Sequence, residues 1–303
     1  MDLTSLEIFE AVAEHCSVTK AATALGRVPS NVTSRIQQLE ADLETTLFSR
    51  ENRKMTLTCE GETFRLYARR IRALAAEARQ AMRATHPSGT LALGTMESTA
   101  VSRLPDMLAQ YRTLFPDVSL HLEMGATQDL AREVLRGKLD CALVARPGRG
   151  MDLATEIIVP ELDVLHADPV LSEELLIVLP PAHPPVQLPS DLDVAGLVAL
   201  EPGCTYRKMA EAWASTVPSL GMTEVSSYHA ILASVAAGAM AGVMPRSVYE
   251  RLQWPVRPAT YSLGRVGTVL VRRKGEASPQ VDALRDLLLA NTTTSQANRT
   301  SRH

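Results

Sequence analysis

Residues 18–43, VTKAATALGRVPSNVTSRIQQLEADL, decide the fold of this chain. Apolar residues recur at helical spacing on both sides of Gly26, which predicts two short helices separated by a tight turn. Glycine after the last periodic residue is typical of a helix end, because it adopts the left-handed conformation easily. Ser17 stands where its hydroxyl can cap the first helix, and Pro29 fits the first turn of the second.

The second of these helices divides into an apolar and a polar face. Its buried stripe would consist of Val32, Ile36, Leu39 and Leu43. The side chains left outside are hydroxyls, amides and a guanidinium, groups that bind phosphates and base edges in the major groove of DNA. They are Ser30, Asn31, Thr33, Ser34, Arg35 and Gln38. A helical hairpin with a merely solvated polar face is the alternative interpretation of the same pattern.

A short hairpin with basic residues is predicted after the two helices. Residues 47–58 contain the segment ENRK, followed by a stretch that alternates in polarity as a strand does. A hairpin in this place is the winged variant of the helix-turn-helix. Arg50, Arg53 and Lys54 would lie beside the duplex and neutralise phosphates. We therefore expect residues 1–58 to form a winged helix-turn-helix DNA-binding domain.

Two runs in this region, AATALGRVPSNVTSRIQQLE (residues 21–40) and LFSRENRKMTLTCEG (residues 47–61), resemble the DNA-binding domain of LysR-type transcriptional regulators. The family's recognition helix usually opens with Ser-Gln-Pro, whereas an ungapped alignment places Val28, Pro29 and Ser30 there. The resemblance extends over the entire chain. The resemblance, the polar face and the hairpin together predict a set of DNA-binding residues. They are Pro29, Ser30, Asn31, Thr33, Ser34, Arg35, Gln38, Arg50, Arg53 and Lys54.

Length and composition predict a cytoplasmic protein with two or more domains. The chain has 303 residues and a formal net charge of −3. Residues 1–85 hold 12 Lys and Arg against 11 Asp and Glu, so clustering rather than bulk charge would supply a nucleic-acid footprint. The cysteines, Cys16, Cys59, Cys141 and Cys204, are isolated in the sequence, which argues against a metal site or a disulfide framework. We expect no metal, no cofactor, no signal peptide and no membrane-spanning segment.

A long helix is predicted from Thr58 to about Ala84, within a linker over residues 59–89 that ends in a hinge at His86–Gly89. An amphipathic helix of this length needs a partner, most simply its copy in a second chain. In the LysR family this helix is the dimerisation element, so the resemblance implies a homodimer, or a homotetramer built from two dimers. The arginines of the helix form either a solvated face or a DNA surface.

Strands and helices alternate after residue 90, which predicts a parallel α/β sheet. By resemblance to the family's effector domain, residues 90–291 form two lobes joined by two crossing strands, as in periplasmic binding proteins. The predicted elements include a helix over Val101–Phe115, a strand over Glu174–Pro180 and a closing helix over Pro279–Leu289. Lobe 1 would comprise residues 90–162 and 266–291, lobe 2 residues 163–265, and the polar residues 292–303 a disordered tail. The overall fold class is α+β.

The ligand site of such a domain is expected where strand ends open onto loops and helix starts. Ser98 and Thr99 follow the first strand, where hydroxyls and free N–H groups suit an anion, although a helix cap explains Ser98 equally well. Glu97 suits a ligand with an amine, or only favours the helix dipole. Two interpretations of Cys204 are open: a reactive thiol, as a nucleophile or redox switch, and a structural thiol. Gln128, Arg146 and His229 each have a surface or capping role as the alternative. The complete set of expected ligand-binding residues is Glu97, Ser98, Thr99, Gln128, Arg146, Cys204, Thr205, Arg207 and His229.

The sequence lacks the motifs of common enzyme classes, such as a G-x-S-x-G elbow, an H-E-x-x-H helix or a phosphate-binding glycine loop. We therefore expect a LysR-type regulator rather than an enzyme. It would bind double-stranded operator DNA and respond to a small-molecule effector, either a small carboxylate or an amino-acid-like metabolite. RNA polymerase is a further candidate partner. We expect no interaction with a membrane. A solute-binding protein or an enzyme on the same two-lobed fold is the alternative.

Overall fold

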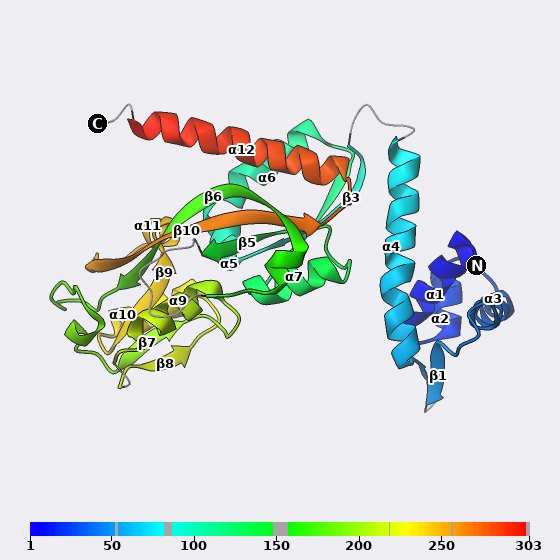
Figure 1. The fold of residues 1–303 in the computed structure, drawn as a ribbon, viewed down its shortest axis with the longest axis horizontal. Coiled ribbons are helices and arrows are strands. Elements are labelled where there is room, and N and C mark those ends of the chain that lie inside the picture. The colour runs from blue at the N-terminus through cyan, green and yellow to red at the C-terminus, as the bar shows by residue number, and fades with distance from the viewer. Residues whose placement is uncertain (52–53, 82–86, 148–156, 218, 256, 301–303) are drawn as a thin grey trace. The chain divides into compact units, whose positions relative to one another are not determined.

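The computed structural model describes residues 1–51, 54–81, 87–147, 157–217, 219–255 and 257–300 (Figure 1). The chain forms two compact units, Met1–Thr85 and His86–His303. The first consists of helices with one β-hairpin, and the second combines a large sheet with helices.

Three helices of the first unit pack around a common core, namely α1 (Leu3–His15), α2 (Val18–Ala24) and α3 (Pro29–Asp42). Ser17 Oγ caps α2 by accepting a hydrogen bond from Lys20 N at 3.4 Å. Gly26 has a φ of +61°, and Arg27 N donates to Ala22 O at 2.8 Å, a pattern that closes a helix. The predicted pair of helices with a turn at Gly26 is therefore confirmed.

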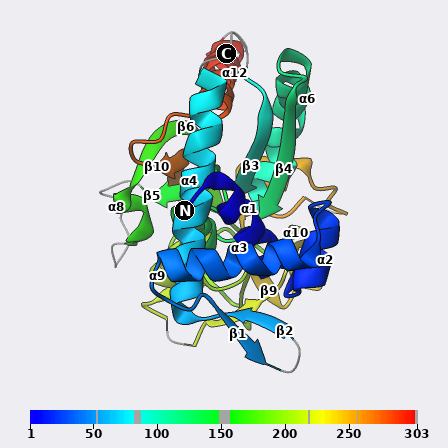
Figure 2. The same cartoon turned by 90° about the vertical axis from the view of Figure 1, so that its right-hand side faces the viewer.

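Helix α3 is amphipathic, as its sequence predicts. Its inward side chains, Val32, Ile36 and Leu39, are buried, and Leu43 is packed against the same core. The ring of Phe9 from α1 lies in this core, with ring centroids 5.2 Å from Phe48 and 5.0 Å from Phe64. Burial of each such side chain contributes about 1.5–3 kcal/mol. Figure 2 shows the outer side of α3, with the hairpin beneath it.

The hairpin after α3 consists of the antiparallel strands β1 (Phe48–Glu51) and β2 (Lys54–Leu57). Glu40 of α3 holds its start, because Glu40 Oε1 accepts hydrogen bonds from Leu47 N at 2.8 Å and Phe48 N at 3.1 Å. Thr58 Oγ1 accepts from Gly61 N at 2.9 Å and so caps the next helix. A Cβ on Gly61 would overlap the backbone oxygen of Leu47, so this close approach requires glycine.

Helix α4 (Cys59–Ala81) joins the core through Phe64 and the buried Ala68. Phe64 packs against the core, and Arg72 forms an ion pair with Glu10 of α1. Three large apolar side chains on one face of α4 are exposed, Tyr67 at 55%, Ile71 at 36% and Leu74 at 63%. Residues 82–86 of the predicted linker lie outside the described residues.

The second unit is built on one eight-stranded sheet with the order β4-β3-β5-β10-β6-β9-β7-β8. Its strands are β3 (Gly89–Thr95), β4 (Val118–Met124), β5 (Cys141–Pro147), β6 (Leu165–Val178), β7 (Gly196–Ala199), β8 (Gly221–Glu224), β9 (Met240–Pro245) and β10 (Thr260–Arg273). β3 is parallel to β4 and β5, and β7 is parallel to β8 and β9. β10 runs antiparallel to β5 and β6, and β6 antiparallel to β9. The parallel arrangement predicted from the strands after residue 90 is confirmed for β3, β4 and β5, and the antiparallel pairings are those that involve β6 and β10.

Strands β6 and β10 connect the two lobes (Figure 1). Residues 166–173 of β6 pair with the part of β10 that also pairs with β5, in lobe 1. Residues 175–178 pair with β9, in lobe 2. The boundary expected at 162/163 therefore precedes a strand that belongs to both lobes. The first half of β6 contains Pro169, which lacks an N–H for the ladder and stands at a register irregularity, so the sequence predicted only its end.

The helices of the second unit are α5 (Glu97–Ser102), α6 (Leu104–Leu114), α7 (Thr127–Leu135), α8 (Glu161–Val164), α9 (Thr205–Ala214), α10 (Tyr228–Ala236), α11 (Arg246–Arg251) and α12 (Pro279–Thr300), with a 3₁₀ turn at Pro189–Asp191. One predicted helix, Val101–Phe115, is instead the pair α5 and α6. Pro105 cannot donate to the preceding turn, so the chain breaks at Arg103.

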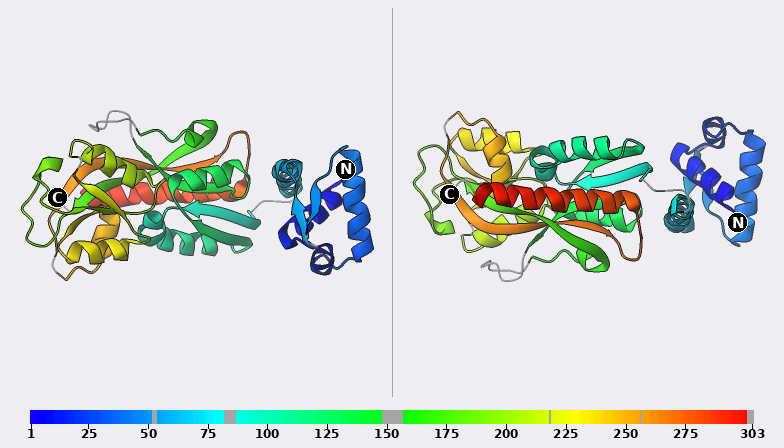
Figure 3. Two further views of the ribbon diagram at one scale, coloured as in Figure 1. Left: turned by 90° about the horizontal axis from the view of Figure 1, so that it is seen from below. Right: turned by 90° about the horizontal axis from the view of Figure 1, so that it is seen from above.

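Helix α12 closes the unit and lies along β6 and α6 (Figure 3). It reaches Thr300, whereas the sequence predicted its end at Leu289 and a disordered tail over residues 292–303. No glycine or proline follows Leu289 to stop the helix, so its backbone hydrogen bonding continues. Within the ranges described above, every helix is too short or too polar to span a bilayer.

Candidate nucleic-acid interface and ligand cavity

The polar face of α3 is open to solvent. Of the residues expected there, Pro29, Ser30, Asn31, Ser34, Arg35 and Gln38 are exposed. Thr33 is half-buried, and its Oγ1 donates to Pro29 O at 3.0 Å within the helix. Because the opposite face of α3 is fixed in the core, these groups are presented outward on a rigid helix.

Carboxylates near α3 engage two of these polar side chains. Arg35 Nη1 lies 3.0 Å from Asp2 Oδ2, and Gln38 Nε2 donates to Asp42 Oδ1 at 3.0 Å. Asp2 also caps α1 by accepting from Ser5 N at 2.7 Å, and this bond, assisted by Arg35, lowers the pKa of Asp2. Exposed ion pairs of this kind are weak, so a polyanion can compete with Asp2 for Arg35.

The expected basic residues of the hairpin are only partly within the described structure. Arg50 stands opposite Met55 in the register of β1 and β2, and Lys54 stands opposite Glu51. The side chains of Arg50 and Lys54 and the whole of Arg53 lie outside the described part of the chain. Phosphate contact by these three residues stays a prediction.

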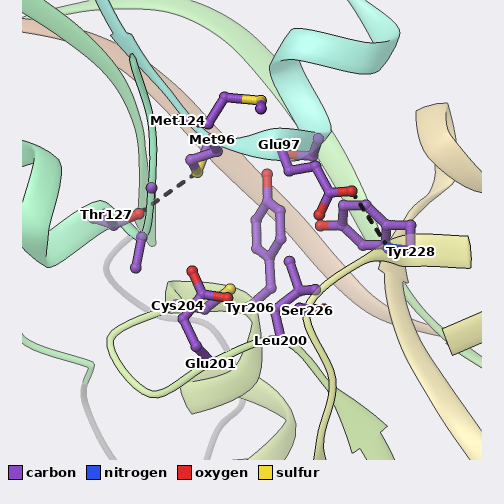
Figure 4. A pocket seen from close by; sticks show the side chains of 13 residues that line it. Met96, Glu97, Met124, Thr127, Leu200, Glu201, Cys204, Tyr206, Ser226 and Tyr228 are labelled. Carbon is purple, nitrogen blue, oxygen red and sulfur yellow. Dashed lines mark hydrogen bonds between the residues drawn. The ribbon is translucent and has the colours of Figure 1, made fainter. Parts of the chain in front are cut away.

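A cavity of about 270 Å³ lies between the two lobes (Figure 4). Lobe 1 supplies the start of α5 and the β4–α7 loop, and lobe 2 supplies the β7–α9 loop, α9 and the start of α10. These are loops that follow the carboxyl ends of parallel strands, where α/β sheets bind ligands. The lining residues are Met96, Glu97, Ser98, Met124, Gly125, Ala126, Thr127, Leu200, Glu201, Cys204, Tyr206, Ser226 and Tyr228.

Two carboxylates give this cavity an acidic character. Glu97 Oε1 accepts from Tyr228 N at 3.4 Å, which joins lobe 1 to lobe 2 across the cavity. Burial raises the pKa of Glu97, the Tyr228 N–H opposes that rise, and the nearby charge of Glu201 adds to it. The lining residues in the described structure include no lysine, arginine or histidine.

Buried hydroxyls form the second feature of the cavity. Ser98 is 2% exposed and Tyr206 is 3% exposed, and within the described residues neither Ser98 Oγ nor the Tyr206 hydroxyl has a partner in hydrogen-bond geometry. Burial raises the pKa values of Tyr206 and Tyr228, so both phenols stay protonated. Unsatisfied buried hydroxyls are rare, and these are therefore available to a ligand.

Five of the nine expected ligand residues lie in or next to the cavity. Glu97, Ser98 and Cys204 line it. Thr99 and Thr205 are buried in the first turns of α5 and α9, and Thr205 Oγ1 has no partner within the described residues.

The other four expected residues do not line the cavity. Gln128 Nε2 donates to Glu161 Oε1 at 3.1 Å, and Arg146 lies 3.9 Å from Asp163. Arg207 pairs with carboxylate oxygens of Glu211 at 2.7 Å and Glu224 at 3.1 Å. His229 is exposed. Gln128, Arg146 and Arg207 contact carboxylates outside the cavity. A residue's place after a strand in the sequence does not predict such a contact.

The environment of Cys204 favours a structural thiol. Its side chain is buried, and burial raises the pKa of the thiol above its ordinary value. A nucleophilic or redox-active cysteine reacts as the thiolate, which this environment disfavours. Among the described residues, no group of three or more His, Cys, Asp or Glu could hold a metal ion.

The sequence interpretation missed five polar lining residues, Thr127, Glu201, Tyr206, Ser226 and Tyr228. Tyr206 follows Thr205 directly, and Tyr228 precedes His229, so the correct loops were identified but not the side chains that face inward. Thr127 Oγ1 donates to Met96 Sδ at 3.5 Å and supports the lobe-1 wall.

Comparison with known proteins assigns both units. Residues 3–62 match the family described as bacterial regulatory helix-turn-helix protein, lysR family, and residues 84–293 match the LysR substrate binding domain. The uncharacterised HTH-type transcriptional regulator YusT of Bacillus subtilis (strain 168) is 36% identical over 284 residues, 90% of each chain.

Solved structures of similar fold span nearly all of the chain. A full-length OxyR variant from Pseudomonas aeruginosa has a TM-score of 0.73 at 20% identity and covers 95% of this chain and 94% of that one. Full-length CbnR complexed with its target DNA has a TM-score of 0.62 at 22% identity, covering 96% and 100%. The helix-turn-helix, the two-lobed unit and these matches together show that this chain belongs to the LysR family of transcriptional regulators.

Proposed function

We propose that the operator binding of this regulator responds to a small-molecule effector held in the cavity between the lobes. The observation that carries the proposal is a cavity walled by both lobes, with the hydroxyls of Ser98 and Tyr206 buried and unpartnered in it. A ligand that contacts both lobes stabilises one angle between them. Such a change would alter the spacing of paired DNA-binding units and the access of RNA polymerase to the promoter. A regulator of this kind acts on chromosomal DNA in the cytoplasm.

The proposed recognition element is α3, with Pro29, Ser30, Asn31, Thr33, Ser34, Arg35 and Gln38 directed to the major groove. Its exposed polar face and its fixed apolar face support this role. Arg50, Arg53 and Lys54 of the hairpin would contact phosphates. A similar fold, that of CbnR, is known in complex with its target DNA.

Self-association is proposed through α4. Tyr67, Ile71 and Leu74 are spaced four and three residues apart, so they form one exposed apolar stripe. Burying this stripe against a second copy removes apolar surface from water, which favours a homodimer or a homotetramer of two dimers. A two-fold dimer would then read two half-sites about one helical turn apart or a multiple of it.

The DNA assignment is tested with the DNA upstream of the protein's own gene, by fluorescence anisotropy at several salt concentrations. We expect Arg35→Ala to weaken binding by about 1–3 kcal/mol if it contacts a base, or to lower the salt slope by about one if it contacts a phosphate. The control is Gln37→Ala, an exposed position on α3 outside the proposed set. Equal affinities and slopes for the wild-type protein and Arg35→Ala would refute the assignment.

The effector assignment is tested by filling the cavity. Ser226 lines the cavity and is exposed, so we expect Ser226→Trp to block the cavity without disturbing the buried core. We expect this variant to bind operator DNA as the wild-type protein does but to lose the response of binding to the low-molecular-weight fraction of cell extract. A response that persists in Ser226→Trp would place the effector elsewhere.

A further inference from the structure

The charge of the cavity restricts the ligand that it can hold. Glu97 comes from lobe 1 and Glu201 from lobe 2, and no basic side chain among the described lining residues neutralises either of them. The arginines on the elements around the cavity are already paired. Arg103, next to α5, lies 2.7 Å from the buried carboxylate of Glu173, and Arg207 of α9 forms two ion pairs outside the cavity.

Aromatic rings and hydroxyls complete the wall. In Figure 4 the ring of Tyr206 rises from α9 toward Met96 and Glu97, and the hydroxyl of Tyr228 points toward the carboxylate of Glu97. Both rings are 3% exposed. A cation beside a desolvated aromatic ring is attracted to its face, so the rings and the two carboxylates favour the same kind of ligand.

We propose that the effector carries a protonated amine, and that this ammonium group is held between Glu97 and Glu201. The inference rests on the proposed effector role of the cavity. An ammonium group donates hydrogen bonds to both carboxylates and removes their mutual repulsion, so its binding pulls the two lobes together. The unpartnered hydroxyls of Ser98 and Tyr206 bind the second polar group of the ligand.

This chemistry selects between the two effector classes expected from the sequence. A simple carboxylate would enter a cavity whose described lining holds two carboxylates and no basic side chain. His229, whose charge acts on Glu97, is exposed and lies outside that lining. An amino acid or a diamine supplies the missing cation. The volume of about 270 Å³ is below the range of about 300–1,000 Å³ usual for pockets of drug-sized ligands, so the amine must be a small metabolite.

The test compares three probes of similar length with the full-length protein, by titration calorimetry and thermal shift at constant ionic strength. Ornithine carries two amines and a carboxylate, 1,4-diaminobutane carries amines only, and glutarate carries carboxylates only. We expect one or both amine probes to bind and glutarate not to bind. Glu201→Gln and Glu97→Gln should each weaken amine binding at least about tenfold, the equivalent of one lost charged hydrogen bond. Glu250→Gln, an exposed carboxylate on α11 outside the cavity, is the matched control and should bind as the wild-type protein does.

Two results would overturn the inference. One is tighter binding of glutarate than of either amine, with a further gain in Glu201→Gln. The other is the absence of any response to both amines in a protein that still responds to cell extract through the cavity. In both cases the proposed effector role stands, because only a response that persists in Ser226→Trp removes it.

Discussion

Glu40→Ala should release the hairpin from α3 and destabilise the first unit. In the wild-type protein, Glu40 Oε1 accepts hydrogen bonds from the backbone N–H groups of Leu47 and Phe48, at 2.8 and 3.1 Å. Both of those residues are buried, so the two donors would lose their partner in a place where water replaces it poorly. A hydrogen bond to a charged group contributes about 1.5–3 kcal/mol. Because Glu40 itself is half-exposed, we expect a total loss of about 2–3 kcal/mol.

The distribution of tryptophan allows the two units to be followed separately. Trp213 and Trp254, the two tryptophans of the chain, both belong to the second unit. In a urea titration, tryptophan fluorescence therefore reports the second unit, whereas far-ultraviolet circular dichroism reports both. With an m-value of about 1.5 kcal/mol/M, the expected loss lowers the midpoint of the first unit by about 1–2 M urea. The fluorescence midpoint should not move.

Two further variants define the cause. Glu40→Gln keeps an oxygen acceptor but removes the charge, so it should lose roughly half as much stability as Glu40→Ala. Gln37→Ala, one turn earlier on the exposed side of α3, should stay within about 0.5 kcal/mol of the wild-type protein. The reasoning is refuted if Glu40→Ala behaves like Gln37→Ala, or if the fluorescence transition shifts with the dichroism transition.

The remaining predictions concern α4 and Glu97. Leu74→Glu places a charge in the exposed apolar stripe of α4 and should shift the protein toward monomer in analytical ultracentrifugation, whereas Glu62→Ala, an exposed position near the start of the same helix, should not. Glu97 has a raised pKa in the folded protein, so the folded state binds its proton more tightly than the unfolded state, and the free energy of unfolding falls as pH rises through that pKa. Glu97→Gln should therefore be more stable than the wild-type protein at pH 7 but not at pH 4, measured by urea titration with tryptophan fluorescence; equal stability at pH 7 would contradict the burial of its charge.

The first unit could be predicted from sequence because its signals are local. A cap at Ser17, a left-handed closing residue at Gly26 and a proline at the first position of α3 each act within a few residues of the chain. The long strand β6 could not be predicted in full, since it is stabilised by pairing with β10, about a hundred residues later. Its first half also contains Pro169, which has no N–H to donate to the ladder.

In the candidate cavity, too, the sequence predicts local features but not the contacts between distant residues. Strand ends and helix starts identified the two loops that meet there, with Ser98 on one and Cys204 on the other. Which side chains face inward depends on contacts made elsewhere. Arg207 is held by Glu224, a residue seventeen positions away in β8, a strand that the sequence did not indicate. One part could have been inferred, because Glu211 stands four residues after Arg207, the spacing of an ion pair along a helix.

The positions of Arg146 and Arg207 in the folded chain determine the charge of the cavity wall. The sequence places Arg146, Arg207 and Glu97 after predicted strands, and these positions left both a small carboxylate and an amino-acid-like metabolite open as the effector. In the folded chain the two arginines pair with carboxylates outside the cavity, and Glu97 stays in its wall, where burial and Glu201 raise its pKa. The described lining of the cavity therefore holds two carboxylates and no lysine, arginine or histidine side chain. A ligand that supplies a cation gains more from this site than one that supplies an anion, although both fit its size.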